Sequence, residues 1–104
     1  MNKYPTPTVG APATIVFYTD TNAAVVTRVS GASIWVQKVE TGEWTTENPG
    51  EPWPVRVAEG VLNRPYGPEQ RFARHDDTGR HGPQKRGEVY VRVGHSTERR
   101  DYRV

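Results

Sequence analysis

Four residues of the segment 75–87 are the first candidates for metal or acid–base chemistry. His75, Asp76, Asp77 and His81 all carry groups that bind cations or transfer protons. Their spacing matches no zinc signature and no two-histidine-one-carboxylate signature. The segment also contains three glycines, so no rigid element would hold the ligands in place. We therefore interpret these residues as solvated loop residues, and the sequence predicts neither a metal site nor a cofactor.

The hydroxyl side chains show no arrangement for nucleophilic catalysis, which requires a Ser, Thr or Cys held beside a base. The chain has no cysteine, and Ser30, Ser33 and Ser96 lie in no elbow-type motif. His95 follows Gly94 at an expected strand end, where we favour a structural or capping role over a binding role. The sequence therefore predicts a protein that is not an enzyme.

Tyrosines close to arginines are the best candidates for a binding function. Tyr90 shares an expected outward face with Arg92, and Tyr102 lies among several arginines. An aromatic ring beside an arginine suits a stacking platform for single-stranded nucleic acid, and it suits a protein-binding hot spot equally well. An ordinary amphipathic surface is the alternative interpretation. The candidate binding residues are Tyr66, Tyr90, Arg92, Arg56, Tyr102 and Arg103.

The composition indicates one small domain built of β-strands. The 104 residues include 14 Val and 11 Thr but only two Ile and one Leu, a bias that suits pleated sheets and disfavours helices. Ten glycines and nine prolines indicate many turns. No apolar run is long enough to span a membrane as a helix. Because aliphatic side chains are few, we expect most of the large aromatics to lie in the core, namely Phe17, Trp35, Trp44, Trp53 and Phe72.

Three apolar runs follow an extended, proline-containing arm at residues 1–12. They predict strands joined by short turns, and hence a meander, at Ala13–Tyr18, Ala23–Val29 and Ser33–Glu40. Further strands are expected at 43–46, 54–58, 71–74, 88–93 and 101–104, with turns at 48–52 and 63–70. Residues 75–87 contain no aliphatic or aromatic side chain, which predicts a mobile loop.

The predicted fold is all-β, with a single barrel domain at residues 13–104. We favour a small antiparallel SH3-like barrel, because the chain opens with a meander and is short for a seven-stranded immunoglobulin sandwich. An OB-fold-like barrel is the alternative.

The charge is unevenly distributed along the chain. Its net charge is +2, and eleven of the 14 basic residues lie in the second half together with seven acids. Eleven of the basic residues are Arg, which makes bidentate contacts with carboxylates and phosphates. We interpret this distribution first as a solvated, arginine-rich surface, and an acidic or nucleic-acid partner is the alternative. No membrane partner is predicted. The lack of cysteine and of a secretory leader predicts an intracellular protein.

Short motifs in three places carry a resemblance to a known group of proteins. They are Val9–Ile15 with Tyr18–Asp20 and Val25–Val29, the turn Asn48-Pro49-Gly50, and Val93-Gly94-His95 followed by Arg99 and Asp101–Val104. In these residues the chain resembles small uncharacterised proteins encoded by tailed bacteriophages and prophages. It departs from their pattern at Val104, where relatives have an aromatic residue, and at 75–87. The resemblance implies a phage origin and action in the bacterial host cytoplasm, and it implies no activity and no site residues.

Together these observations predict a binding module that contacts a host macromolecule. A host protein is the preferred partner, because the modest net charge argues against strong non-specific binding of nucleic acid. In that case the chain would act as a counter-defence or host-takeover inhibitor. An RNA- or DNA-binding module and a minor virion or assembly protein are the alternatives.

Overall fold

The structure is a computed structural model that describes residues 8–17, 20–31, 33–52, 54–74, 80–82 and 89–101. This part of the chain contains strands and no helix, so it holds no helix that could cross a membrane. The predicted all-β class is therefore confirmed. The eight strands are β1 (Pro12–Val16), β2 (Thr21–Ser30), β3 (Ser33–Thr41), β4 (Thr45–Thr46), β5 (Val55–Arg74), β6 (Arg80–Gly82), β7 (Tyr90–Val93) and β8 (Thr97–Asp101).

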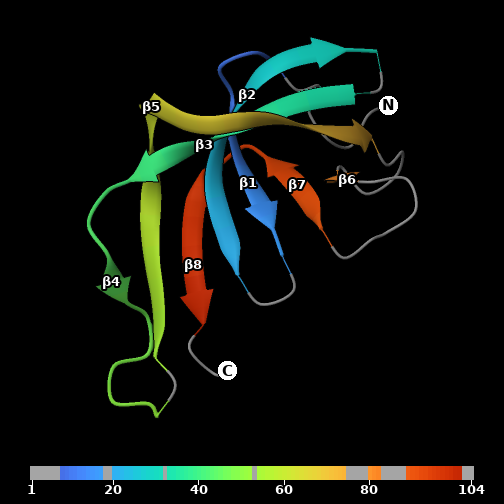
Figure 1. Cartoon of the computed structure of the whole chain (residues 1–104). Coiled ribbons are helices and arrows are strands. Elements are labelled where there is room, and N and C mark those ends of the chain that lie inside the picture. The colour runs from blue at the N-terminus through green and yellow to red at the C-terminus, as the bar shows by residue number, and fades with distance from the viewer. Residues whose placement is uncertain are drawn as a thin grey trace.

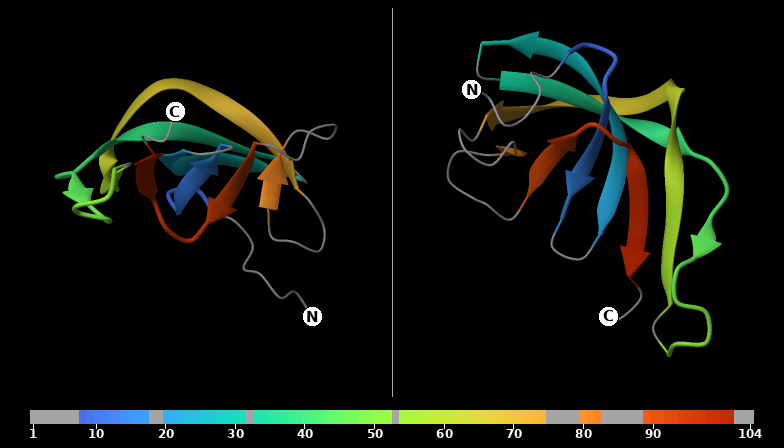
Figure 2. Two further views of the ribbon diagram at one scale, coloured as in Figure 1. Left: turned by 90° about the horizontal axis from the view of Figure 1, so that it is seen from below. Right: turned by 180° about the vertical axis from the view of Figure 1, so that it is seen from behind.

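All strand pairs are antiparallel and belong to one sheet, in which the order is β1-β7-β6-β5-β3-β2-β8 and β4 pairs with β5 beside this path. Two further pairings, β1 with β2 and β5 with β8, bend the sheet into a partial ring (Figure 1). Seen from below, β3 and β5 arch over β1 and β7 (Figure 2). Strands from the two ends of the chain, β1 and β7, thus lie side by side, and β3 and β5 cover the interior from the other side (Figure 2).

The predicted meander is present in β1, β2 and β3. Val16 pairs with Thr21 at the first turn, and Ser30 pairs with Ser33 at the second. Gly31 in the second turn has a φ of 57°, a left-handed conformation that glycine adopts without steric cost. The predicted turns therefore separate these strands, although β1 ends at Val16, before the predicted Tyr18, and β2 begins at Thr21, before the predicted Ala23.

β5 is one bent strand of 20 residues, and the turn expected at 63–70 lies inside it. The prediction of a break there is wrong. The register between β3 and β5 shifts on each side of Tyr66, so the turn-forming residues make bulges and the strand continues. Gly67, with a φ of 76°, supplies the left-handed residue at one of these bulges. The bends allow the later part of β5 to pair with β3 and its first part to pair with β8.

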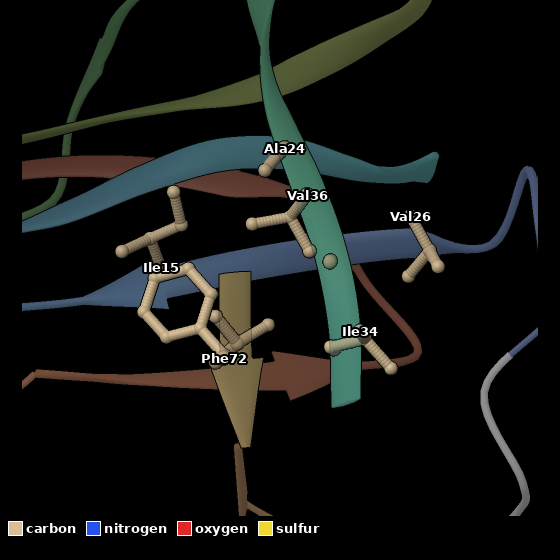
Figure 3. Packing of buried hydrophobic residues seen from close by; sticks show 8 residues of the cluster. Ile15, Ala24, Val26, Ile34, Val36 and Phe72 are labelled. Atoms are coloured by element: carbon tan, nitrogen blue, oxygen red, sulfur yellow. The ribbon is translucent and has the colours of Figure 1, made fainter. Parts of the chain in front are cut away.

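The main core is aliphatic and joins β1, β2, β3, β5 and β7 (Figure 3). Of the aromatic residues expected in the core, Phe72 is buried, and Phe17 is half-buried and packs against the cluster. Trp35 and Trp44 are half-buried and belong to neither buried cluster, and Trp53 lies outside the described residues. Ala, Val and Ile side chains together with Phe72 fill this interior, and the indoles lie further out. The cluster consists of Ala13, Ile15, Ala24, Val26, Ile34, Val36, Phe72 and Val91.

A second buried cluster lies on the opposite face of β2 and consists of Ala23, Val25 and Val39. β5 passes over it at a glycine. A Cβ atom on Gly60 would lie 2.8 Å from Ala23 Cβ and 2.8 Å from Val39 Cγ2, and it would collide with Ser96 Oγ. Only glycine allows this close approach of β5.

Two hydroxyl groups attach the segment between β7 and β8 to the first hairpin. Thr14 Oγ1 donates to the His95 carbonyl at 2.8 Å and accepts from the Thr97 amide at 3.2 Å. Ser96 Oγ accepts from the Ala24 amide and donates to the Ala24 carbonyl, both at 3.0 Å. These bonds hold the start of β8 beside β2. β8 begins four residues before the strand expected at 101–104.

The predicted arm at 1–12 and the predicted mobile loop at 75–87 lie mostly outside the described residues, which exclude 1–7, 75–79 and 83–88. Within the predicted loop, Arg80–Gly82 form β6, which pairs with β5 and β7. The last residue of the predicted arm, Pro12, is the first residue of β1.

Candidate functional site

A half-buried tryptophan with two stacked arginines lies across three neighbouring strands. Trp35 in β3 pairs with Arg28 in β2 and with Arg71 in β5. The guanidinium carbon of Arg28 is 4.6 Å from the centroid of the indole ring, and that of Arg71 is 5.8 Å away. Both distances are in the range of a cation–π interaction. We call these three residues the tryptophan–arginine row. It lies where β2 ends and β3 begins (Figure 1).

The positive charge of the row is not balanced within the part of the chain that the structure describes. Both arginines are exposed, and neither forms an ion pair there, whereas Arg64, Arg99 and Arg100 each pair with a glutamate. Arg71 Nε donates to Ser33 Oγ at 3.1 Å, which orients its guanidinium group. The row therefore presents two positioned guanidinium groups whose charge is not paired with any acid in the described residues.

A second stacked pair, Trp44 and Arg100, lies beyond the other end of β3. The Arg100 guanidinium carbon is 5.5 Å from the Trp44 ring centroid, and its Nη2 atom is 3.4 Å from Glu98 Oε1. Glu98 is only 7% exposed, so its carboxylate depends on this partner to offset the cost of leaving water. We call these three residues the Trp44 cluster. The charge of Arg100 is therefore paired with an acid of the same chain.

A hollow of about 460 Å³ opens beside the Trp44 cluster. Tyr66, one of the predicted binding residues, lines it and is 46% exposed. Arg56, another, is exposed and pairs with Arg100 in the β5–β8 register. The hollow is lined by Glu40, Thr41, Trp44, Tyr66, Glu98 and Arg100. Both of its acids pair with arginines, Glu40 with Arg64 at 3.5 Å, so the hollow carries mixed and largely compensated charge.

A second hollow, of about 530 Å³, lies over β4, β5 and β8. Thr45 Oγ1 in its wall donates to the Val57 carbonyl at 3.4 Å, which is a structural contact. The lining combines small apolar and hydroxyl side chains with two glutamates, and none of its residues is a histidine, cysteine or lysine. It consists of Gly42, Glu43, Thr45, Val57, Ala58, Glu59 and Thr97.

The histidines do not form a recognisable site in the described residues, where no group of three potential ligands could hold a metal ion. His75, Asp76 and Asp77 lie outside those residues, and only the backbone of His81 is described, in β6. His95 is exposed, and its carbonyl accepts the hydrogen bond from β1 described above. Its observed role is structural and belongs to its main chain.

The remaining predicted binding residues lie elsewhere. Tyr90 is half-buried and Arg92 is exposed on β7, which pairs with β1 and β6. Tyr102 and Arg103 lie outside the described residues. The structure therefore does not gather the predicted residues into one site: two are near the hollow and two are on β7.

The tryptophan–arginine row is not among the predicted site residues, although the register of the β2–β3 hairpin places two of its members opposite each other. Counting back from the pair Ser30 and Ser33, Arg28 falls opposite Trp35. The small number of aliphatic residues predicts this tryptophan in the core. The third member, Arg71, carried no such signal, since the bulges of β5 shift its register with β3.

Comparisons of the chain with protein-family models, with curated proteins and with solved structures found no match. Its function therefore has to be inferred from its own surface.

Proposed function

We propose that this chain is a non-enzymatic binding module that contacts a protein of a bacterial host, as a counter-defence or host-takeover inhibitor. The tryptophan–arginine row is the observation that carries this proposal. Trp and Arg are among the residues most enriched at binding hot spots. Stacking already restricts the side chains of Arg28 and Arg71, so less conformational entropy would be lost when a partner binds.

The polar groups elsewhere support a binding role over catalysis, because the fold already uses them. Ser96 Oγ and Thr14 Oγ1 each donate one hydrogen bond and accept another within the sheet. Glu98 is engaged by Arg100, and Glu47 by Arg99. Groups committed in this way are not poised as nucleophiles or proton carriers.

Phage origin, action in the host cytoplasm and the finer fold class are parts of the same proposal. The first two rest on the short motifs that resemble small phage and prophage proteins. The third, an SH3-like barrel with an OB-fold-like barrel as the alternative, is supported by the opening meander β1–β2–β3 and by the pairing of β1 with β7.

Binding of RNA or DNA is the second candidate function, and the uncompensated charge of Arg28 and Arg71 favours it. Two guanidinium groups would neutralise about two phosphates, which supports only weak binding at physiological salt. We therefore place the protein partner first.

The test is capture of partners from a nuclease-treated host lysate on immobilised wild-type protein, Trp35→Ala and Trp44→Ala, with circular dichroism to verify folding. We expect one protein to be retained by the wild type and by Trp44→Ala. Its loss from Trp35→Ala should correspond to at least about 2 kcal/mol of binding free energy. Equal retention by all three proteins, or no retained protein, contradicts the proposal. Tight binding of fluorescent oligonucleotides at about 50 mM salt that collapses at about 200 mM would favour the nucleic-acid function.

A further inference from the structure

The surroundings of the tryptophan–arginine row indicate the chemistry of the segment that it binds. Positions two residues from Trp35 on β3 share its face of the sheet, and they hold the neutral residues Ser33 and Gln37. Gln37 Nε2 donates to the Gly67 carbonyl at 2.7 Å, so its side chain is already engaged. Glu69, two residues before Arg71, forms no ion pair with a described residue. With two arginines and one glutamate, this face carries a net positive charge.

We propose that the row docks an acidic protein segment, in which Asp or Glu carboxylates pair with the guanidinium groups of Arg28 and Arg71. This inference rests on the proposed function and specifies the partner's chemistry. The two arginines stand on the strands flanking β3, so their Cα atoms lie about 10 Å apart. An extended segment carries alternate side chains on one face about 6.7 Å apart, and long arginine side chains can close that difference.

The hydrogen bonding of Arg71 suits a carboxylate. Its Nε atom is used by Ser33 Oγ, which leaves the two Nη groups to meet the two oxygens of one carboxylate. Such bidentate contacts are among the stronger charge-assisted hydrogen bonds.

The stacking geometry disfavours nucleic acid as the occupant. Each neighbouring strand supplies one guanidinium group to the Trp35 ring, so a base could stack there only by displacing an arginine. Single-stranded nucleic acid obtains much of its affinity from base stacking on aromatic side chains. Without stacking, two phosphate contacts would remain.

The experiment compares three fluorescent probes by anisotropy at low salt: a short peptide of alternating Glu and Thr, its Gln–Thr counterpart, and a short oligothymidylate. The proteins are the wild type, the double variant Arg28→Gln/Arg71→Gln, and the control Arg56→Gln/Arg92→Gln, which removes two exposed arginines outside the row. We expect the Glu–Thr peptide to bind the wild type and the control equally. We expect the row variant to bind it at least about tenfold more weakly.

The inference is overturned if the two double variants bind the Glu–Thr peptide equally, if the wild type does not bind it, or if the Gln–Thr peptide binds as well. Tighter binding of the oligothymidylate to the row would also overturn it and would favour a nucleic-acid partner. Capture from the lysate separates the two proposals. A host protein retained by Arg28→Gln/Arg71→Gln supports the binding module and refutes acidic docking on the row. Row-dependent peptide binding with no captured protein supports the charge preference and refutes the host-protein function.

Discussion

The tryptophan–arginine row and the Trp44 cluster contain the same type of contact in different charge environments. In both, a guanidinium group stacks on an indole ring, at 4.6 Å and 5.8 Å from Trp35 and at 5.5 Å from Trp44. At Trp44 a buried glutamate balances the cation, whereas at Trp35 no described residue does so. The two stacked contacts therefore differ in their local charge balance, and the proposal of a binding surface rests on that difference.

The two regions also differ in what they contribute to the fold. The Trp44 cluster lies where β5 pairs with β8, close to the glycine and serine contacts that bring these strands together. The row lies on the β2–β3 hairpin beside a register shift between Val26 and Arg28, and its side chains stand outside the main core. Changes at the Trp44 end should therefore alter stability, while changes at the row should alter binding.

We expect the greatest loss of stability from a substitution at the glycine where β5 passes over β2. Gly60→Ala would force a Cβ atom against Ala23, Val39 and Ser96. We expect the free energy of unfolding to fall by about 2–3 kcal/mol, as for other overpacked sites. Gly42→Ala is the matched control, because its Cβ would meet only the Glu59 carbonyl oxygen, at an ordinary 3.7 Å. Urea denaturation measures both, and equal stability of the two variants would show that β5 does not approach so closely.

A smaller loss of stability is expected when Arg100 is removed, and a still smaller one when Arg28 is removed. Arg100→Ala leaves the buried Glu98 carboxylate without its ion-pair partner, and we expect a loss of about 1–2 kcal/mol in unfolding free energy. This is less than for a fully buried pair, because the Arg100 side chain is 58% exposed. Arg28→Ala should cost about 0.5 kcal/mol or less, since no described acid depends on it. A larger loss for Arg28→Ala than for Arg100→Ala in urea denaturation would reverse the comparison.

The affinity of the row for an acidic segment should depend only modestly on salt concentration. Because the row offers two cations, affinity for an acidic segment should fall by no more than about tenfold between about 50 and 200 mM salt. Anisotropy titrations with the Glu–Thr peptide measure this dependence. A fall of about a hundredfold or more would require additional cations beyond the row in the binding surface.

The parts of the fold that could be predicted from sequence are those with local signals. Asp20 and Gly31 mark the turns of the meander, and the alternation of Val89, Val91 and Val93 marks the strand that faces the main core. The continuity of β5 could not be predicted, because Pro65 and Gly67 have the same residue types in a bulge as in a turn.

The exposure of Trp35 is harder to predict because β3 is buried on both faces. Ile34 and Val36 point into the main core, while Val39 belongs to the second cluster on the opposite face. A period of two assigns residues to two faces, but it does not say which part of a face is covered. Trp35 shares a face with Val39 and is nevertheless only half-buried, because β5 covers the Val39 end. Only the tertiary bend of β5 separates the two environments.

Binding of a partner at the Trp35 row and not at the Trp44 cluster can be observed through the indole N–H signals of the ¹⁵N-labelled protein. Trp35→Phe and Trp44→Phe assign the two signals, and the Glu–Thr peptide is the titrant. We predict that the Trp35 signal shifts progressively with peptide while the Trp44 signal stays in place. A shift of the Trp44 signal with Trp35 unchanged would contradict the account and place binding at the hollow beside Tyr66.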